Sequence, residues 1–374
     1  MKKLSLVTFL RLSLKIKAVA FLLLWSFAML YICWLSGIRH DYVFYLKIWN
    51  LMISGLDPWI PGNSYGPLHN TFAYLISLSD LAPKFLFASS LLFANSLLLM
   101  EGIRRRSHNF SLSVYLTTIP FNVLVIGIGF RYGLNDGLIA FFMTCAVVCR
   151  AKDRNIAAGA LIGLGALLKF YPLLLLPFVA LSAKKYKYLL VITGIVVFVI
   201  GMVCSYFVWG KSILNPIFFG MDRGPRFLSI FASLDAVFGK NMFLDMLLKY
   251  NTLIMILAII IAFVICVRNK VNWINSLVVG YLTMLTFYKV GHPQYYVPLL
   301  FMVFASWIFS ERKFDKFAFC YIPLAIFLSL YQISFFYHTS YSSLLWVGQY
   351  GGFFAFALAL GSIFYSLRGN LSRS

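Results

Sequence analysis

The sequence predicts an all-α polytopic membrane protein that forms a single integral membrane domain over residues 1–374. Three observations support this fold class. Hydrophobic residues make up 61% of the chain and charged residues 11%, whereas charged residues are about a quarter of a soluble protein. The mean hydropathy is +0.87. Apolar runs bounded by polar or charged residues recur along the whole chain, as a bundle of about 12 transmembrane helices requires.

The individual helices follow from these apolar runs. The first run comes after a basic N-terminal stretch and has no small-residue cleavage site behind it, so we expect a spanning helix and no cleavable signal peptide. In chain order, the runs that we assign as membrane passages are 18–35, 83–100, 111–131, 136–149, 157–168, 171–183, 188–209, 251–267, 271–287, 296–309, 317–333 and 344–367.

Two of these runs leave the topology open. Runs 157–168 and 171–183 are shorter than the roughly 17 residues that a spanning helix needs, so a single kinked helix is the alternative. With two passages, the basic clusters at 104–106, 150–154, 184–187, 268–270 and 312–316 all fall on the side of the basic N-terminus. The positive-inside rule therefore favours two passages and places both termini in the cytoplasm.

The net charge of +21 is explained by this topology, so we expect no nucleic-acid partner. The other side of the membrane then holds two long segments, residues 36–82 and 210–250, the first with short interfacial helices. Short turns at 130–135, 169–170, 288–295 and 335–343 lie on the same side. The six cysteines show no CxxC spacing, which indicates neither a disulfide framework nor a zinc site.

Asp41 is the first candidate for chemistry. Apolar residues at helical spacing predict an interfacial helix over 40–54, which Gly55 and Pro58 end. Asp41 lies at its start, immediately after the first spanning helix. Its side chain is either a helix cap, a partner of the neighbouring basic residues, or a general base. Asp57, in Gly-Leu-Asp-Pro, is interpreted as a turn residue.

The order of short motifs in this region resembles a known family. Asp41-Tyr42, Gly55-Leu56-Asp57-Pro58-Trp59 and Tyr65-Gly66-Pro67-Leu68 are similar to the start of multispanning glycosyltransferases with the GT-C fold. The likeness is to glycosyltransferase family 87, the polyprenyl-phosphate-mannose-dependent transferases, which carry Asp, Gly-x-x-Pro-Tyr and Tyr-x-Pro-Pro-Leu. This chain has Trp59 in place of the tyrosine and Gly66 in place of the first proline.

Three later stretches extend the resemblance. Residues 131–138, Arg-Tyr-Gly-Leu-Asn-Asp-Gly-Leu, stand where the family has a turn that opens a helix, and Asp136 is predicted to be the N-cap of that helix. Residues 157–172 are similar to an Ala-Gly-rich helix that ends in Lys and Pro, and Gly159, Gly163 and Ala166 allow close helix packing. Residues 288–296 resemble a late Pro-Gln-Tyr element.

The resemblance assigns roles to polar residues on the non-cytoplasmic side. Lys169 either snorkels or caps carbonyl groups, or it neutralises the phosphate of a lipid-linked donor. Arg223 and Arg226 flank a Gly-Pro turn and are either solvated or placed to clamp a phosphate or a sugar acid. The predicted substrate-binding residues are Arg131, Lys169, His292, Arg223, Arg226, Tyr42 and Gln294.

The family likeness implies an inverting hexosyltransferase, with mannose favoured, that uses a polyprenyl-phosphate-linked sugar donor. Its acceptor is a glycan or glycolipid hydroxyl, and Asp41 is the catalytic base. Because the outer segments hold no paired-carboxylate or DxD pattern, no metal is expected, and no cofactor is expected either. The resemblance places the protein in a bacterial inner membrane, with its active site on the periplasmic or extracellular side. A lipid-linked oligosaccharide polymerase or ligase remains an alternative, and so does a lipid-sugar transporter or flippase. The absence of a clear internal repeat disfavours the transporter.

Overall fold

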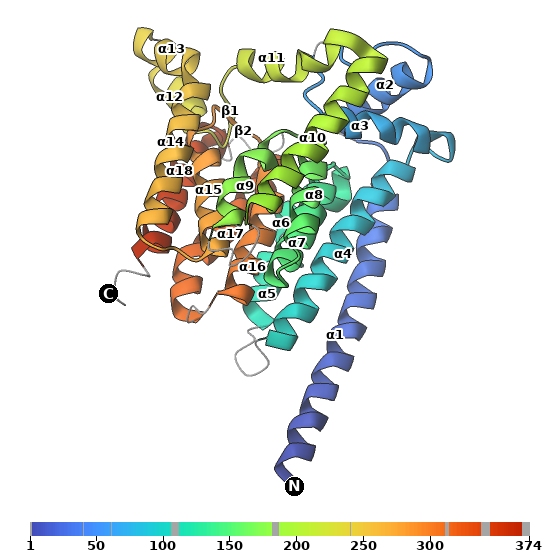
Figure 1. Ribbon diagram of the computed structural model, residues 1–374, viewed down its shortest axis with the longest axis vertical. Coiled ribbons are helices and arrows are strands. Elements are labelled where there is room, and N and C mark those ends of the chain that lie inside the picture. The colour runs from blue at the N-terminus through green and yellow to red at the C-terminus, as the bar shows by residue number, and fades with distance from the viewer. Residues whose placement is uncertain are drawn as a thin grey trace.

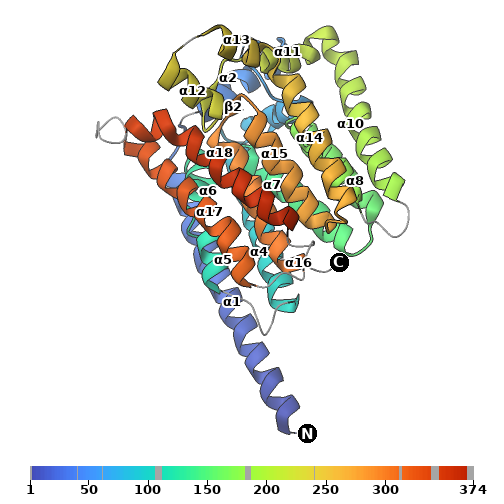
Figure 2. The ribbon, with the colours of Figure 1, turned by 90° about the vertical axis from the view of Figure 1, so that its left-hand side faces the viewer.

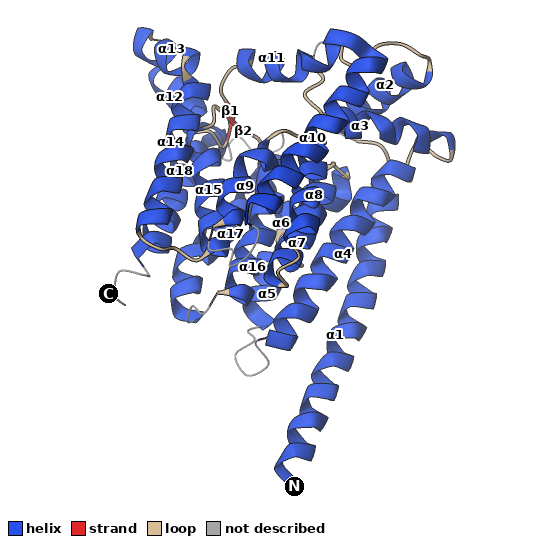
Figure 3. Cartoon of the chain, in the orientation of Figure 1, coloured by secondary structure: helices blue, strands red, loops and turns tan. Residues whose placement is uncertain are grey.

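The computed structural model describes residues 2–39, 41–60, 62–105, 112–181, 187–239, 241–310, 314–337 and 345–368. Within these residues the chain is a bundle of helices with one pair of two-residue strands (Figures 1 and 3). Parts of the predicted basic clusters lie outside the described residues, namely Arg106, Lys184, Lys185, Arg312 and Lys313; so do His40 and Lys240.

The helices in the first half of the chain are α1 (Lys2–Leu35), α2 (Asp41–Ile53), α3 (Pro67–Thr71), η1 (Phe72–Ser77), α4 (Ala82–Arg105), α5 (Leu112–Thr118), α6 (Val123–Val125), η2 (Ile126–Tyr132), α7 (Asp136–Ala151), α8 (Asn155–Ala166), η3 (Tyr171–Leu175) and α9 (Leu176–Ala180). The second half contains α10 (Lys187–Trp209), η4 (Gly210–Leu214), α11 (Asn215–Asp222), β1 (Arg226–Phe227), α12 (Ile230–Phe238), α13 (Met242–Lys249), α14 (Asn251–Arg268), α15 (Trp273–Phe287), β2 (Val290–Gly291), η5 (Pro293–Tyr295), α16 (Tyr296–Phe309), α17 (Phe314–Tyr337) and α18 (Leu345–Arg368).

The hydrophobic core lies where α7, α15 and α16 meet the surrounding helices. Nearly every side chain of α15 and α16 is buried, whereas α10 and α14 present large apolar side chains at the surface. A helix that is apolar on its exposed face suits a lipid environment, because water would penalise that surface. The described chain is therefore a helical membrane protein with a buried apolar centre and apolar side chains on its outer flanks.

The described structure does not confirm the predicted number of about 12 membrane passages. Among the described residues, five helices are long and apolar enough to cross a bilayer: Ile16–Leu35, Ala82–Arg105, Tyr188–Gly220, Asn251–Arg268 and Gln349–Leu367. A sixth is added if Val123–Tyr132 and Asp136–Ala151, which meet at a bend of 117°, count as one broken span. The remaining apolar helices are shorter, so the expected number of about 12 is not confirmed.

The short runs around residue 169 form a hairpin of two legs. At one end, Lys169 Nζ donates to Asp136 Oδ2, at the start of α7. At the other end, Arg150 Nε, near the end of α7, donates to the carbonyl of Val179 in α9. The chain must therefore reverse between α8 and α9, because those two contacts lie at opposite ends of α7. This geometry favours two separate legs over a single kinked helix.

Small residues bring α8 and α10 into backbone contact. A Cβ atom on Gly159 would overlap the carbonyl oxygen of Leu190, and one on Gly163 would lie 2.6 Å from the carbonyl oxygen of Gly194. Only glycine fits such an approach, as in small-residue helix packing in membranes. The close packing predicted for this Gly-rich stretch is confirmed at these two positions.

The short helices of the two long segments gather at one end of the bundle. Figures 1 and 2 place α2, α11 and α13 at the end opposite the N-terminus. The predicted helix at 40–54 is present as α2, and it stops as expected at Gly55, whose φ is +72°. Trp59 N donates to Asp57 Oδ1 at 2.9 Å, so Asp57 is the turn residue that the sequence predicted.

Candidate active site

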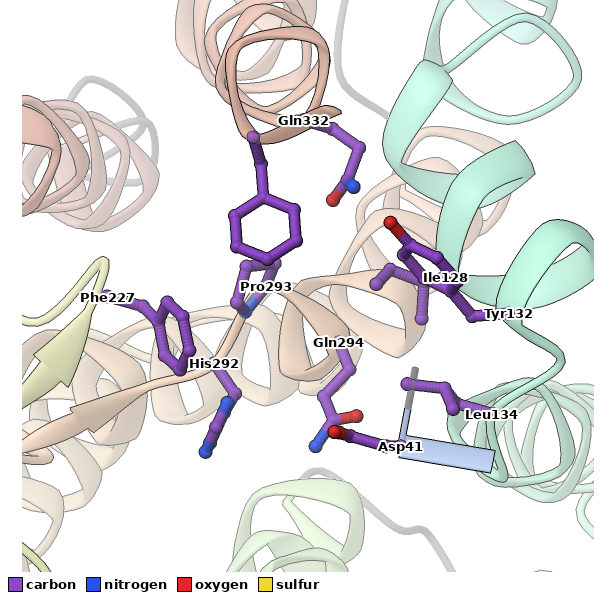
Figure 4. A pocket seen from close by; sticks show the side chains of 10 residues that line it. Asp41, Ile128, Tyr132, Leu134, Phe227, His292, Pro293, Gln294 and Gln332 are labelled. Atoms are coloured by element: carbon purple, nitrogen blue, oxygen red, sulfur yellow. The ribbon is translucent and has the colours of Figure 1, made fainter. Parts of the chain in front are cut away.

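A small, partly open pocket lies at that end of the bundle, between α2, η2, the β1–β2 pair and α17 (Figure 4). It has Asp41 on one wall and His292 on another. The residues that line it are Asp41, Ile128, Tyr132, Leu134, Phe227, His292, Pro293, Gln294, Gln332 and Phe335. Three predicted site residues, Asp41, His292 and Gln294, therefore meet in one pocket although they are far apart in the sequence.

Asp41 is held at this pocket by the aromatic face of α2. Its neighbours Tyr42, Tyr45 and Trp49 are fully buried at helical spacing, and the Trp49 Nε1 donates to the carbonyl of His69 at 2.9 Å. Asp41 is the first residue of the helix and is half-buried. A carboxylate at a helix N-terminus is stabilised by the helix dipole. A rigid helix thus fixes the position of this carboxylate.

The second long segment reaches the pocket through a parallel strand pair. Arg226 N donates to Lys289 O at 3.1 Å and Leu228 N donates to Gly291 O at 3.0 Å. This pairing places Phe227 against the ring of His292, with 4.7 Å between ring centroids. The sequence predicted both stretches as functional but gave no sign that they pair as strands, because two-residue strands have no hydrophobic period.

Arg223 and His292 form a direct contact beside the pocket. Arg223 Nη2 lies 2.9 Å from His292 Nε2, and because a guanidinium only donates, that ring nitrogen must accept. Burial, with Arg223 next in weight, lowers the pKa of His292 from 6.5 to about 3. The imidazole is therefore neutral at ordinary pH, and Arg223 carries the positive charge. The Arg223 Nε atom is buried without a hydrogen-bond partner among the described residues.

Lys169 lies in a buried ion pair near the same region. Its Nζ donates to Asp136 Oδ2 at 2.7 Å, and both side chains are almost completely buried. Burial lowers the pKa of Lys169, and Asp136 opposes that shift. The ammonium also lies over the rings of Tyr65 and Tyr295, at 5.5 and 5.1 Å from their centroids. The lysine is thus held inward, and it neither snorkels nor caps a carbonyl group through any hydrogen bond that the described chain shows.

The predicted N-cap role of Asp136 is wrong by one position. Asn135 is the N-cap residue of α7, and Asp136 is the first helical residue. The carboxylate of Asp136 is instead the partner of Lys169, and its Oδ1 atom has no partner among the described residues. The sequence could not show this pairing, because the two residues come together only when α8 folds back along α7.

Sequence reasoning missed His69, which is fully buried close to this ion pair. Asn135 Nδ2 lies 3.1 Å from His69 Nδ1, and Tyr45 donates to Asn135 Oδ1 at 3.2 Å. Burial lowers the pKa of His69 well below its ordinary value, with Lys169 the second cause. The available signal was its place directly after the motif Tyr65-Gly66-Pro67-Leu68, in a chain with only five histidines.

The same motif is attached to the end of α8 by its backbone. Gly66 N donates to Leu168 O at 2.9 Å and Leu68 N donates to Leu167 O at 3.0 Å. A Cβ atom on Gly66 would overlap the carbonyl oxygen of Leu167. Gly66 therefore lets the motif satisfy carbonyl groups at a helix end, and it sets Tyr65 beside Lys169.

The other predicted site residues have different surroundings. Tyr42 is buried, and its hydroxyl donates to Asp80 O at 2.7 Å. Arg131 lies over the Phe336 ring at 4.5 Å. Arg226 is exposed on β1. Gln294 is buried in the pocket, where Figure 4 shows its amide beside Asp41. Substrate roles for Tyr42, Arg131 and Arg226 stay predictions.

The charges of the site act on one another. Asp41 is among the groups that raise the pKa of Lys169 and that of His292, against the lowering effect of burial. Arg223 influences the same two groups. A carboxylate that can accept a proton thus shares one region with cations that can bind an anion. Among the described residues, no group of three or more His, Cys, Asp or Glu side chains is placed to hold a metal ion.

Comparison with known proteins finds one family that the central part of the chain resembles. Residues 64–221 match the model of glycosyltransferase family 87. This range contains Tyr65, Asp136 and Lys169, whereas Asp41 and His292 lie outside it. None of the curated proteins matches the chain significantly. The resemblance inferred from the short motifs is therefore confirmed over this central segment, which is similar to the membrane glycosyltransferases of family 87.

Proposed function

We propose that the protein transfers a hexose from a polyprenyl-phosphate-linked donor to a hydroxyl of a glycan or glycolipid on the non-cytoplasmic face of the membrane. Mannose is the favoured sugar through the family likeness. The observation that carries this proposal is the pocket itself, which has the Asp41 carboxylate on one wall and His292, bound to Arg223, on another. A base is thus available for the acceptor hydroxyl, and a cation is available for the leaving phosphate.

Asp41 is the catalytic base in this proposal. The acceptor hydroxyl gives its proton to the Asp41 carboxylate while its oxygen forms a bond to the anomeric carbon. The bond from that carbon to the phosphate oxygen breaks on the opposite face of the sugar, and the configuration inverts. A half-buried carboxylate at the start of a rigid helix suits this role, because a general base must be held within hydrogen-bond reach of the proton that it takes.

Arg223 is the cation placed best for the leaving phosphate. The polyprenyl phosphate monoester gains negative charge as the glycosidic bond breaks, so a fixed cation stabilises the transition state more than the bound donor. Arg223 has a buried Nε atom with no partner among the described residues, and its Nη2 is oriented by His292. Lys169 contributes less positive potential, because Asp136 already neutralises much of its charge.

Gln294 is the residue that we assign to sugar or acceptor hydroxyl groups. It is buried in the pocket, and its Oε1 atom has no partner within the described chain. An amide both donates and accepts hydrogen bonds, which matches the alternating character of hydroxyl groups on a sugar. Its position beside Asp41 (Figure 4) would place such a hydroxyl at the base.

The test is a transfer assay with purified protein, a panel of radiolabelled polyprenyl-phosphate sugars and a lipid extract as acceptor. Asp41→Asn should lower kcat by about 10²- to 10⁴-fold, because it removes the general base. Arg223→Gln should lower kcat and also raise the donor KM, since it removes charge from the phosphate site. Asp57→Asn is the matched control, because Asp57 is exposed and serves a turn.

The outcomes separate the proposal from its alternatives. Transfer that survives Asp41→Asn would eliminate the proposed base. Transfer from lipid-diphosphate oligosaccharides, with no activity on any polyprenyl-phosphate sugar, would support a polymerase or ligase instead. Movement of a labelled lipid-linked sugar across proteoliposomes without any bond formed would support a transporter.

A further inference from the structure

Lys84 is a fully buried lysine that the mechanism above does not use. It lies in the first turn of α4, and its ammonium contacts four oxygen atoms of neutral groups. These are Cys33 O at 3.0 Å, Ser36 Oγ at 2.8 Å, Gly37 O at 2.7 Å and Arg131 O at 2.8 Å. An ammonium has three protons, so one of these hydrogen bonds is shared.

The four acceptors belong to two segments that adjoin residues of the pocket lining. Cys33, Ser36 and Gly37 form the end of α1 and the short link that leads into Asp41. Arg131 lies in η2, a seven-residue π-helix that places Ile128 and Tyr132 in the pocket lining. Cations are stabilised at helix C-termini, where carbonyl groups lack helical partners. The Lys84 ammonium therefore links the segment that precedes Asp41 to η2 through hydrogen bonds.

The backbone of Lys84 makes a second link to the same helix. Its N–H donates to the hydroxyl of Tyr42, the residue after Asp41, at 3.1 Å. That hydroxyl in turn donates to Asp80 O at 2.7 Å. Both the main chain and the side chain of Lys84 thus form hydrogen bonds to the residues that flank Asp41.

Gly133 makes room for the lysine. Its φ is +64°, and a Cβ atom there would overlap Cγ of Lys84 and lie 2.7 Å from its Cε. Gly133 directly follows η2, in the stretch Arg131-Tyr132-Gly133-Leu134. The glycine therefore serves two purposes, the left-handed turn and the passage of the Lys84 side chain to its four acceptors.

We propose that Lys84 is a positioning residue for the transfer reaction, because it fixes the spacing between Asp41 and the η2 wall of the pocket. This inference rests on the proposed role of Asp41 as the base. A general base displaced by about 1 Å can cost about 10²-fold in rate. Lys84 itself touches neither the donor nor the acceptor, since it does not line the pocket.

The kinetic test compares Lys84→Met and Gly133→Ala with wild type in the transfer assay. Each substitution should lower kcat about 10²-fold and leave the donor KM within about twofold, because the phosphate site is untouched. The double variant should be no slower than Lys84→Met alone, since both changes act through one side chain. Lys47→Met is the control, because it removes an exposed lysine from α2 and should leave kcat unchanged.

A second measurement decides the inference without any substrate. Spin labels at Val43→Cys and Phe121→Cys, both exposed positions placed in a cysteine-free background, report the separation of α2 from the segment that leads into η2. Lys84→Met should broaden this distance distribution. An unchanged distribution, or multiplicative losses of kcat in the double variant, would overturn the positioning role. Loss of activity by Asp41→Asn without any effect of Lys84→Met would overturn it while leaving the proposed function intact.

Discussion

The contact between Arg223 and His292 shows how one side chain fixes the protonation state of another. A guanidinium cannot lose its proton in this range, so the imidazole nitrogen that faces it must be unprotonated. Burial of the ring acts in the same direction. The arrangement keeps His292 as a neutral orienting group, and it leaves the positive charge of the pocket on Arg223.

The lowered pKa of His292 predicts how stability depends on pH. Its pKa is about 3 in the folded protein and about 6.5 in the unfolded chain. Below pH 6.5 the unfolded chain therefore binds a proton that the folded protein refuses, so folding stability falls as the pH falls from 6.5 toward 3. The limiting slope for one such group is about 1.4 kcal/mol per pH unit. The measurement is the Tm of detergent-solubilised protein from pH 7 to pH 4.

His292→Gln is the variant that isolates this effect. It removes the titrating ring, so its Tm should decline less with falling pH than the wild-type Tm does. The decline should not vanish, because His69 also has a pKa lowered well below its ordinary value. Parallel pH profiles for the two proteins would contradict a buried neutral His292.

The sequence marked some of the site residues as functional and not others. Asp41, Lys169 and His292 were found because an isolated polar group beside an apolar run is costly and calls for a reason. Lys84 and His69 were assigned no role. Lys84 stands at the start of the predicted passage 83–100, where a lysine can simply extend to the interface, and His69 lies in a long connecting segment; both become buried only when several elements fold together. The partner of Lys169 was unpredictable for the same reason, since Asp136 reaches it through the reversal between α8 and α9.

At the scale of elements, apolar runs predicted where helices occur better than how long they are. The run 111–131 is divided into α5, α6 and η2. Pro120 stands at the break between α5 and α6. Within η2, a Cβ atom on Gly129 would overlap the side chain of Leu91, so this part of the run packs closely against α4. The run 157–183 becomes two short legs of a hairpin. Hydrophobicity alone does not distinguish a spanning helix from a buried helix in a broken span, because both exclude water.

The packing of α8 against α10 leads to a stability prediction. Gly159→Ala should destabilise the protein by about 1–3 kcal/mol, because the added methyl group meets the backbone of Leu190, which has no side-chain freedom to move away. Gly165→Ala on the same helix is the matched control, since its Cβ atom would find only ordinary contacts at 3.7 Å. Thermal unfolding of the two variants in detergent should show a lower Tm for Gly159→Ala alone. Equal Tm values would show that the two helices separate readily.

On the scale of the whole molecule, the basic cluster at the end of α4 and the candidate active site lie at opposite ends of the bundle. Helix α4 begins beside the segment that leads to Asp41, where Lys84 binds Gly37, and it ends at Arg105. There Glu101 accepts from Arg104 at 2.6 Å and pairs with Lys152 at 3.3 Å. The basic cluster is thus a helix length away from the pocket. Cationic loops are retained in the cytoplasm, so this separation supports a pocket on the non-cytoplasmic side.

The orientation of the protein can be tested with single cysteines in intact cells. Asn50→Cys on α2 and Lys249→Cys on α13 lie at the pocket end, and Arg154→Cys lies just after the basic end of α7; all three positions are exposed. In a cysteine-free background, a membrane-impermeant maleimide should label the first two from outside. It should label Arg154→Cys only after the cells are permeabilised, because a cytoplasmic loop is closed to the reagent. The reverse pattern would place Asp41 in the cytoplasm. A donor facing the outer side of the membrane would then never reach the base, and the transfer proposed for the non-cytoplasmic face would have to be abandoned.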